Sequence, residues 1–170
     1  MSVKEHKKAT MEPIRCKVIT VSDTRNEETD KSGALMMDLL KSQGHIVTEY
    51  EIVKDERDAI QGAVTAGCKS SQVDVILTNG GTGIAKRDVT IEAVKELMTK
   101  EIPGFGELFR MLSYQEDIGS AAILSRAIAG VAFDKAIFST PGSSGAVRLA
   151  MNKLILPELG HVVGELRKDT

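Results

Sequence analysis

The sequence predicts an α/β fold with a mostly parallel sheet and helices on both of its faces. Short apolar runs alternate along the chain with segments whose apolar residues recur at helical spacing. Several of the apolar runs end in turns rich in glycine, serine or aspartate. Because ligands of such folds bind beyond the carboxyl ends of the strands, we expect the functional site among these turns.

In the first half of the chain the expected order is strand, helix, strand, helix, strand. The strands are expected at 14–21, 46–53 and 73–77, because each is a short run rich in Ile, Val and Leu. Gly44 is expected to end the first helix in a left-handed turn. The two helices are marked by apolar residues on one face: Leu35, Met36, Leu39 and Leu40 in the first, and Ile60, Ala63, Val64, Gly67 and Cys68 in the second.

The second half of the chain is less regular. A helix is predicted by apolar residues at helical spacing, which are Ile91, Val94, Leu97 and Met98. A second helical stretch is expected after Pro103. Residues 121–124 and 130–133 are expected to be two short strands, or loops packed under the sheet. A further apolar strand at 135–139 is followed by a Pro-Gly-Ser-Ser turn and by a helix that begins at about Ser144.

Composition argues against several classes of protein. The 22 Lys and Arg residues are interspersed with 24 Asp and Glu residues, so the basic footprint of a nucleic-acid-binding protein is missing. No apolar run is long enough to cross a membrane, and residues 1–12 lack the core of a signal peptide. Cys16 and Cys68 have no CxxC spacing, which favours buried reduced thiols. We expect a cytoplasmic protein with a flexible segment at 1–12 and one domain at 13–170.

The stretch at 78–88, Thr-Asn-Gly-Gly-Thr-Gly-Ile-Ala-Lys-Arg-Asp, carries the strongest chemical signal. Gly80, Gly81 and Gly83 follow a buried strand and permit backbone angles that residues with a Cβ avoid. Their N–H groups, together with Thr82, are therefore expected to cradle a phosphate. The alternative is a glycine-rich turn that only connects a strand to a helix.

Charged residues follow the glycines at once. Lys86 and Arg87 add two cations, and Asp88 adds a carboxylate suited to a divalent metal. Thr90 is expected to cap the helix that comes next. The stretch thus predicts a site for phosphate and metal.

Seven short segments between about Ile14 and Leu156 occur in an order that is more specific than any one of them. They are Val21-Ser-Asp23, Asp55, Gly80-Gly-Thr-Gly83, Arg87-Asp-Val-Thr90, Pro103-Gly-Phe-Gly-Glu107, Leu124-Ser-Arg126 and Pro141-Gly-Ser143. In this order they resemble the MoaB/Mog family of molybdenum-cofactor biosynthesis proteins. The Ser-Ser-Gly after Gly142 and the segment Arg110-Met-Leu-Ser113 resemble its MoaB branch.

The resemblance implies a three-layer α/β/α fold with a mixed sheet and molybdopterin as the ligand. It also implies a homotrimer or a hexamer, and other enzymes of molybdenum-cofactor synthesis as partners. In the Mog branch the activity is adenylylation of molybdopterin by Mg·ATP, whereas function in the MoaB branch is less uniform. We therefore expect a molybdopterin adenylyltransferase. The alternatives are a non-catalytic molybdopterin carrier and an oligomeric scaffold.

The resemblance also implies roles for single residues. Asp55 and Asp88 are expected to be the catalytic residues, because together they would hold the Mg²⁺ ion that neutralises phosphate charge. Lys86 and Arg87 would contact the triphosphate. The pterin half of the site would comprise turn residues from several strand ends, namely Ser22, Asp23, Ser125, Arg126, Pro141, Gly142 and Ser143.

Several of these residues have a purely structural alternative. Asp55 could cap the helix that follows it, and Asp88 could be a turn acid that bonds its own backbone. Arg126 could be an ion-pair residue of the surface. Ser143 could serve only as the cap of the last helix.

Overall fold

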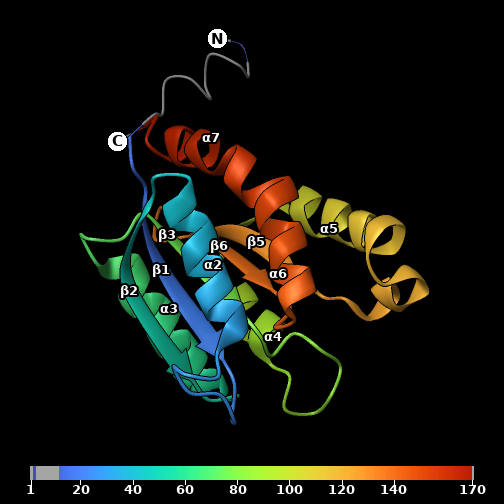
Figure 1. Cartoon of the computed structure of the whole chain (residues 1–170). Helices are drawn as coiled ribbons and strands as arrows, with labels where there is room; N and C mark the ends of the chain where they lie inside the picture. The colour runs from blue at the N-terminus through green and yellow to red at the C-terminus, as the bar shows by residue number, and fades with distance from the viewer. Residues whose placement is uncertain (1, 3–11, 170) are drawn as a thin grey trace.

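The computed structural model describes residues 2 and 12–169. The flexible segment expected at 1–12 therefore lies almost wholly outside the described residues. Within them, six strands form one mixed sheet in the order β2-β1-β3-β6-β5-β4 (Figure 1). The strands are β1 (Arg15–Val21), β2 (Ile46–Val53), β3 (Val75–Asn79), β4 (Lys100–Glu101), β5 (Ile128–Ala132) and β6 (Lys135–Thr140).

Helices cover both faces of this sheet, so the expected three-layer α/β/α fold is confirmed (Figure 1). One face carries α2 (Lys31–Ser42), α5 (Pro103–Glu116), α6 (Ser144–Ala150) and α7 (Leu156–Leu166). The other face carries α3 (Arg57–Lys69) and α4 (Thr90–Leu97). A 3₁₀ helix, η1 (Gly119–Leu124), follows α5, and a π-helical turn, η2 (Met151–Ile155), joins α6 to α7.

The strands β2, β1, β3 and β6 are parallel, so their carboxyl ends meet at one edge of the sheet. The chain leaves β1 for α2 on one face and leaves β3 towards α4 on the other. The point between β1 and β3 is therefore the switch point at which α/β folds bind their ligands. The turns that the sequence singled out all lie at this edge.

Strand boundaries agree with expectation for β1 and β2 and differ further along the chain. The expected strand at 73–77 lies at Val75–Asn79, because Val73 belongs to the turn before it and donates its amide to Ser70. The segment 121–124 is wrong as a strand or loop, since it lies in η1. The second short strand lies at Ile128–Ala132 rather than 130–133 and runs antiparallel to β6.

Two hydrophobic cores lie on the two sides of the sheet. Phe105 and Phe109 of α5 pack in the first core, where Phe105 meets Phe138 edge to face at 5.4 Å between ring centroids. Cys16 and Cys68 are buried free thiols, as expected. Burial raises the pKa of the Cys16 thiol to about 12, so the group stays protonated and inert. None of the helices in the described ranges is long and apolar enough to cross a membrane.

Lys17 of β1 is a buried cation, with only 2% of its surface exposed. Its ammonium group donates to the carbonyl of Ala63 at 2.8 Å and lies 2.8 Å from Glu51 and 3.4 Å from Glu49. Both glutamates belong to β2, at the edge of the sheet. The stem of the lysine crosses α3 so closely that a Cβ at Gly67 would lie 2.8 Å from its Cδ.

Asp74 joins the amino end of the sheet to the last helix. Its carboxylate accepts from the backbone amide of Arg15 at 2.9 Å, from the guanidinium of Arg15 at 3.0 Å and from that of Arg167 at 3.2 Å. Burial alone would raise the pKa of Asp74, but the hydrogen bonds and charge of Arg15 outweigh it, and the net pKa is lowered. The folded state therefore favours the ionised carboxylate.

We expect Asp74→Asn to lower the free energy of unfolding by about 2 kcal/mol at pH 7. A lowered pKa contributes stability above the unfolded-state value of about 3.9, and this contribution disappears as the pH falls through the folded-state value. The difference between parent and variant in urea unfolding should therefore shrink below about pH 4. An equal difference at pH 7 and pH 3 would contradict the assignment.

Candidate functional site

A pocket of about 380 Å³ lies at the carboxyl edge of the parallel strands. The turns after β1, β2, β3 and β6 contribute to its wall, together with the end of η1. It is lined by twelve of the residues expected from the sequence: Ser22, Asp23, Asp55, Gly80, Gly81, Thr82, Gly83, Arg87, Asp88, Ser125, Pro141 and Gly142. Three expected residues, Lys86, Arg126 and Ser143, do not line it.

The glycine loop, residues 80–83, lines this pocket and includes two glycines with positive φ angles. Gly80 and Gly81 have φ angles of +95° and +68°, which favour glycine. The Gly80 amide is already bonded to the carbonyl of Thr140 at 3.1 Å. In the described part of the chain, by contrast, the amides of Gly81, Thr82 and Gly83 donate to no protein acceptor. A ligand with phosphate oxygens could satisfy them.

Thr90 of α4 forms two hydrogen bonds to the glycine loop. Its amide donates to the carbonyl of Gly81 and its hydroxyl to the carbonyl of Gly80, both at 3.0 Å. The expectation that Thr90 is a helix cap is wrong, because Val89 occupies the N-cap position and Thr90 begins α4. The hydroxyl faces the loop instead, so Thr90 fixes the orientation of the Gly80 and Gly81 carbonyls.

Asp23 and Asp55 bind each other through reciprocal hydrogen bonds. The amide of Asp23 donates to Asp55 Oδ2 at 3.1 Å, and the amide of Asp55 donates to Asp23 Oδ1 at 3.0 Å. Asp55 is not the cap of α3, since the N-cap is Glu56 and no side chain caps that helix. Burial, and next the negative charge of Asp23, raise the pKa of Asp55. A divalent cation would relieve this repulsion.

The two expected catalytic carboxylates stand on either side of the glycine loop. A Cβ built on Gly81 would lie 3.1 Å from Asp55 Oδ1, and one on Gly83 would lie 2.6 Å from Asp88 Oδ2. Asp88 Oδ2 also accepts from the amide of Ala85 at 3.1 Å, so the turn-acid alternative is right about this bond. Arg87 reaches the pocket, whereas the side chain of Lys86 is exposed outside it.

The two carboxylates fit one magnesium ion better than a protein-built metal cage. Within the described residues, no group of three or more His, Cys, Asp or Glu side chains is placed to hold a metal. Magnesium, however, takes only one or two protein carboxylates when phosphate oxygens and water complete its shell. Asp55 and Asp88 therefore suit a magnesium ion that arrives with a nucleotide.

Arg126 contacts the glycine loop but does not line the pocket. Its Nε donates to the carbonyl of Thr82 at 3.0 Å, and its Nη2 donates to that of Gly83 at 2.7 Å. It also forms an ion pair with Glu92 of α4, whose pKa its hydrogen bond lowers. The ion pair of the structural alternative is therefore present, and Arg126 also holds the carbonyls of the glycine loop.

The residues of the turn after β6 have two different roles: some line the pocket and one caps α6. Ser143 Oγ accepts from the amide of Ala146 at 3.2 Å, so this serine caps α6 and stays out of the pocket lining. Pro141 and Gly142 do line the pocket. A Cβ on Gly142 would lie 3.1 Å from the Cα of Gly80, and the two turns are therefore in contact.

Sequence reasoning missed Arg25, which lines the pocket in the turn after β1. Its guanidinium donates to the carbonyl of Gly142 at 3.0 Å. No motif marks this residue, because it is one of several charged residues in a polar loop. The only signal was its position three residues beyond Ser22, at a strand end that already pointed to the site.

Comparison with known proteins agrees with the fold. The family model of a probable molybdopterin binding domain matches residues 17–161. The chain is 68% identical over 169 residues to molybdenum cofactor biosynthesis protein B of Bacillus subtilis (strain 168), with 99% of each chain covered.

Solved structures give the same result. A crystal structure of molybdenum cofactor biosynthesis protein B superposes with a TM-score of 0.90 at 69% identity, covering 91% of this chain and 96% of that one. The tungsten cofactor synthesizing protein MoaB from Pyrococcus furiosus superposes with a TM-score of 0.82 at 38% identity, covering 92% and 99%. The chain therefore belongs to the MoaB/Mog family of molybdenum-cofactor biosynthesis proteins.

Proposed function

We propose that this protein acts in molybdenum-cofactor biosynthesis by binding molybdopterin and transferring to it the adenylyl group of Mg·ATP. One observation carries the proposal. Three loop amides, those of Gly81, Thr82 and Gly83, lie between the carboxylates of Asp55 and Asp88 without protein acceptors in the described chain. Amides offer hydrogen bonds to phosphate, and carboxylates offer ligands to its metal ion.

In the transfer step a phosphate oxygen of molybdopterin attacks the α-phosphorus of ATP. The new P–O bond forms as the bond from the α-phosphorus to the bridging oxygen breaks, and pyrophosphate leaves. The attacking oxygen is already ionised at neutral pH, so the protein needs no general base. What the reaction needs is charge neutralisation and alignment.

The residues of the pocket meet these needs in different ways. Asp55 and Asp88 would hold the magnesium ion, which supplies positive charge to the phosphates. The free amides would orient the phosphates over the loop, and Arg87 would contact the triphosphate. We do not retain Lys86 as a ligand, because its side chain lies outside the pocket.

A second function, that of a non-catalytic molybdopterin carrier, is favoured by one contact. Asp88 already accepts a hydrogen bond from Ala85, which turns one of its oxygens towards its own loop. A carboxylate occupied in this way could leave the nucleotide half of the site idle. The carrier would bind molybdopterin but turn over no ATP.

Turnover separates the two functions. The parent protein is mixed with Mg·ATP and molybdopterin, and pyrophosphate release is followed with and without the pterin. An adenylyltransferase releases pyrophosphate only when both substrates are present. Calorimetric titration with each ligand in turn would detect binding alone. Molybdopterin binding without pyrophosphate release would establish the carrier.

We also propose that the chain forms a closed homo-oligomer, a trimer or a hexamer. Phe105 and Phe109 of α5 lie in the core. Leu108, Met111 and Tyr114 of α5 are instead 47%, 47% and 61% exposed. Apolar side chains gathered on an exposed helix face are typical of a subunit interface.

Sedimentation at micromolar concentration is expected to give an oligomer for the parent and smaller species for Met111→Glu, because a buried charge without a partner opposes association. Glu107→Gln, which alters a neighbouring polar position of the same helix, serves as the control. A monomeric parent would exclude the proposed assembly.

A further inference from the structure

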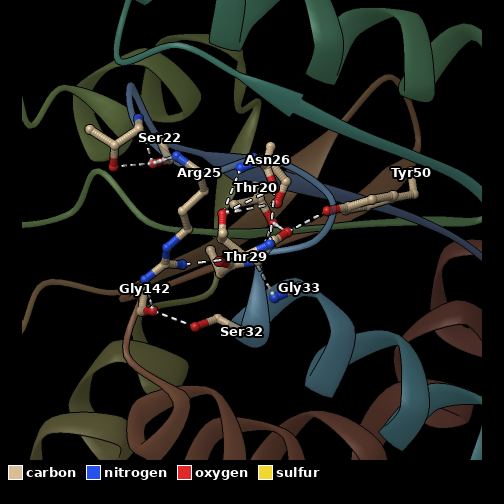
Figure 2. A network of polar contacts seen from close by, with 12 residues as sticks. Thr20, Ser22, Arg25, Asn26, Thr29, Ser32, Gly33, Tyr50 and Gly142 are labelled. Carbon is tan, nitrogen blue, oxygen red and sulfur yellow. Dashed lines mark hydrogen bonds and ion pairs between the residues drawn. The ribbon is translucent and has the colours of Figure 1, made fainter.

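Arg25 is a cation of the pocket to which the family resemblance gave no role. Its side chain lines the pocket and is 32% exposed, so a ligand can reach it. Figure 2 shows it extending from the turn after β1 towards Gly142, where Nη2 donates to the carbonyl oxygen at 3.0 Å. On its other side, Nη1 lies 3.7 Å from Asp30 Oδ1.

Asp30 is a buried anion outside the pocket, with a side chain that is 0% exposed. Its carboxylate accepts from the hydroxyl of Thr20 at 2.6 Å, from the amide of Gly33 at 2.9 Å and from the hydroxyl of Tyr50. Burial, and next the hydrogen bond to Asp30, raise the pKa of Tyr50, so its hydroxyl remains a donor at neutral pH. A carboxylate fixed by three donors is a rigid support for Arg25.

The carbonyl of Gly142 is fixed from a second direction as well. The hydroxyl of Ser32, in the first turn of α2, donates to the same oxygen that Arg25 contacts (Figure 2). The guanidinium is thus anchored at both ends, by Asp30 and by Gly142. Arginine carries five N–H donors in a planar fork, and those left over can bind an oxyanion at little cost in side-chain entropy.

The negative charge of the pocket means that a phosphate ligand would need a cation such as Arg25 to bind. Asp23, Asp55 and Asp88 line it with negative charge, and the cations in its lining are Arg25 and Arg87. A ligand with several phosphates would be repelled unless both guanidinium groups and a metal ion countered that charge. Arg87 follows the glycine loop, whereas Arg25 contacts the turn after β6.

We propose that Arg25 binds a phosphate group at the Pro141–Gly142 side of the pocket, and that Asp30 is the positioning residue that orients it. The phosphate is assigned to molybdopterin, which rests on the function proposed above. The alternative source is the triphosphate of ATP. We favour the pterin because Arg25 donates to Gly142, which is assigned to the pterin half of the site, whereas the free amides assigned to the nucleotide are those of residues 81–83.

Titrations with each ligand distinguish these two sources. Arg25→Gln is expected to raise the Kd of molybdopterin about 10- to 100-fold, the scale for losing a hydrogen bond between charged groups. The Kd of Mg·ATP should change less than about twofold. Arg87→Gln is the matched variant and should show the reverse pattern. Arg25→Lys should recover only part of the loss, because one ammonium cannot reproduce the planar fork.

The positioning role of Asp30 has its own test. Asp30→Asn keeps a side chain that caps α2 nearly as well, but it removes the charge that faces Arg25. We expect the Kd of molybdopterin to rise about 3- to 10-fold. Tyr50→Phe is the control, because it removes a donor to the same carboxylate without touching Arg25. It should lower the melting temperature and raise the Kd of molybdopterin less than Asp30→Asn does.

Each outcome bears on a different claim. If Arg25→Gln binds molybdopterin as tightly as the parent does, the proposal for Arg25 is wrong while the proposed function stands. If Arg25→Gln raises the Kd of Mg·ATP instead of that of molybdopterin, the phosphate that Arg25 binds belongs to the nucleotide. If Asp30→Asn and Tyr50→Phe change the Kd equally, Asp30 acts through stability alone. A parent that binds neither ligand would overturn both the function and this inference.

Discussion

Replacing Asp55 by Asn is expected to slow adenylyl transfer by at least about 10²-fold, the scale for losing one electrostatic stabiliser of a phosphoryl transition state. Asn is nearly the same size as Asp and can still accept the hydrogen bond from the Asp23 amide. It carries no charge, however, and is a poor ligand for magnesium. Pyrophosphate release from Mg·ATP and molybdopterin is the measurement.

The melting temperature of Asp55→Asn should stay near that of the parent. Since Asp55 does not cap α3, removing its charge costs no helix cap, and it relieves repulsion with Asp23. Molybdopterin affinity should also be unchanged. Full transfer activity in Asp55→Asn, in a preparation whose parent is active, would remove Asp55 from the catalytic residues.

Gly80→Ala is expected to lower the free energy of unfolding by about 2 to 4 kcal/mol. The residue has a φ of +95°, where an L side chain is strained, and a Cβ there would overlap the carbonyl oxygen of Val21. That oxygen belongs to β1, so it cannot move without distorting the sheet. Urea unfolding monitored by circular dichroism measures the loss.

Gly62→Ala is the matched control for this substitution. Gly62 lies inside α3, its φ is not positive, and a Cβ there would meet no atom within 4 Å. Alanine should therefore stabilise the protein by about 0.5 to 1 kcal/mol, because it restricts the unfolded chain and favours the helix. Equal effects of the two substitutions would show that the geometry of the glycine loop is not required for folding.

The sequence predicted the parallel part of the sheet well because its strands are short apolar runs that turns separate clearly. It was wrong at 121–124, which lies in η1, and it placed the short strand β5 about two residues too late. The second error has a local reason. The turn between β5 and β6 uses Phe133 and Asp134 at φ angles of +51° and +60°. Hairpin turns with positive φ normally carry Gly or Asn, so this pair gave no turn signal.

At the candidate site, the sequence identified the strand ends but could not assign the direction of each side chain. Ser143 and Arg126 stand in the right turns, yet both point to backbone groups rather than to the pocket. Arg25 shows the converse error, because it lines the pocket although no motif marked it. Its position depends on nearby Asp30 and on Gly142, which lies 117 positions further along the chain. Contacts of that kind depend on the assembled sheet and leave no periodic pattern.

The buried lysine of β1 has a consequence for aggregation. An edge strand of eight residues, such as β2, exposes backbone groups on which another chain could add a strand. Glu49 and Glu51 place two carboxylates along that edge, and the buried ammonium of Lys17 holds them there. Replacing the glutamates by apolar residues would thus make the β2 edge prone to aggregation. It would also leave the buried charge of Lys17 without a partner carboxylate. The same ion pairs therefore neutralise the buried charge of Lys17 and discourage another chain from adding a strand at β2.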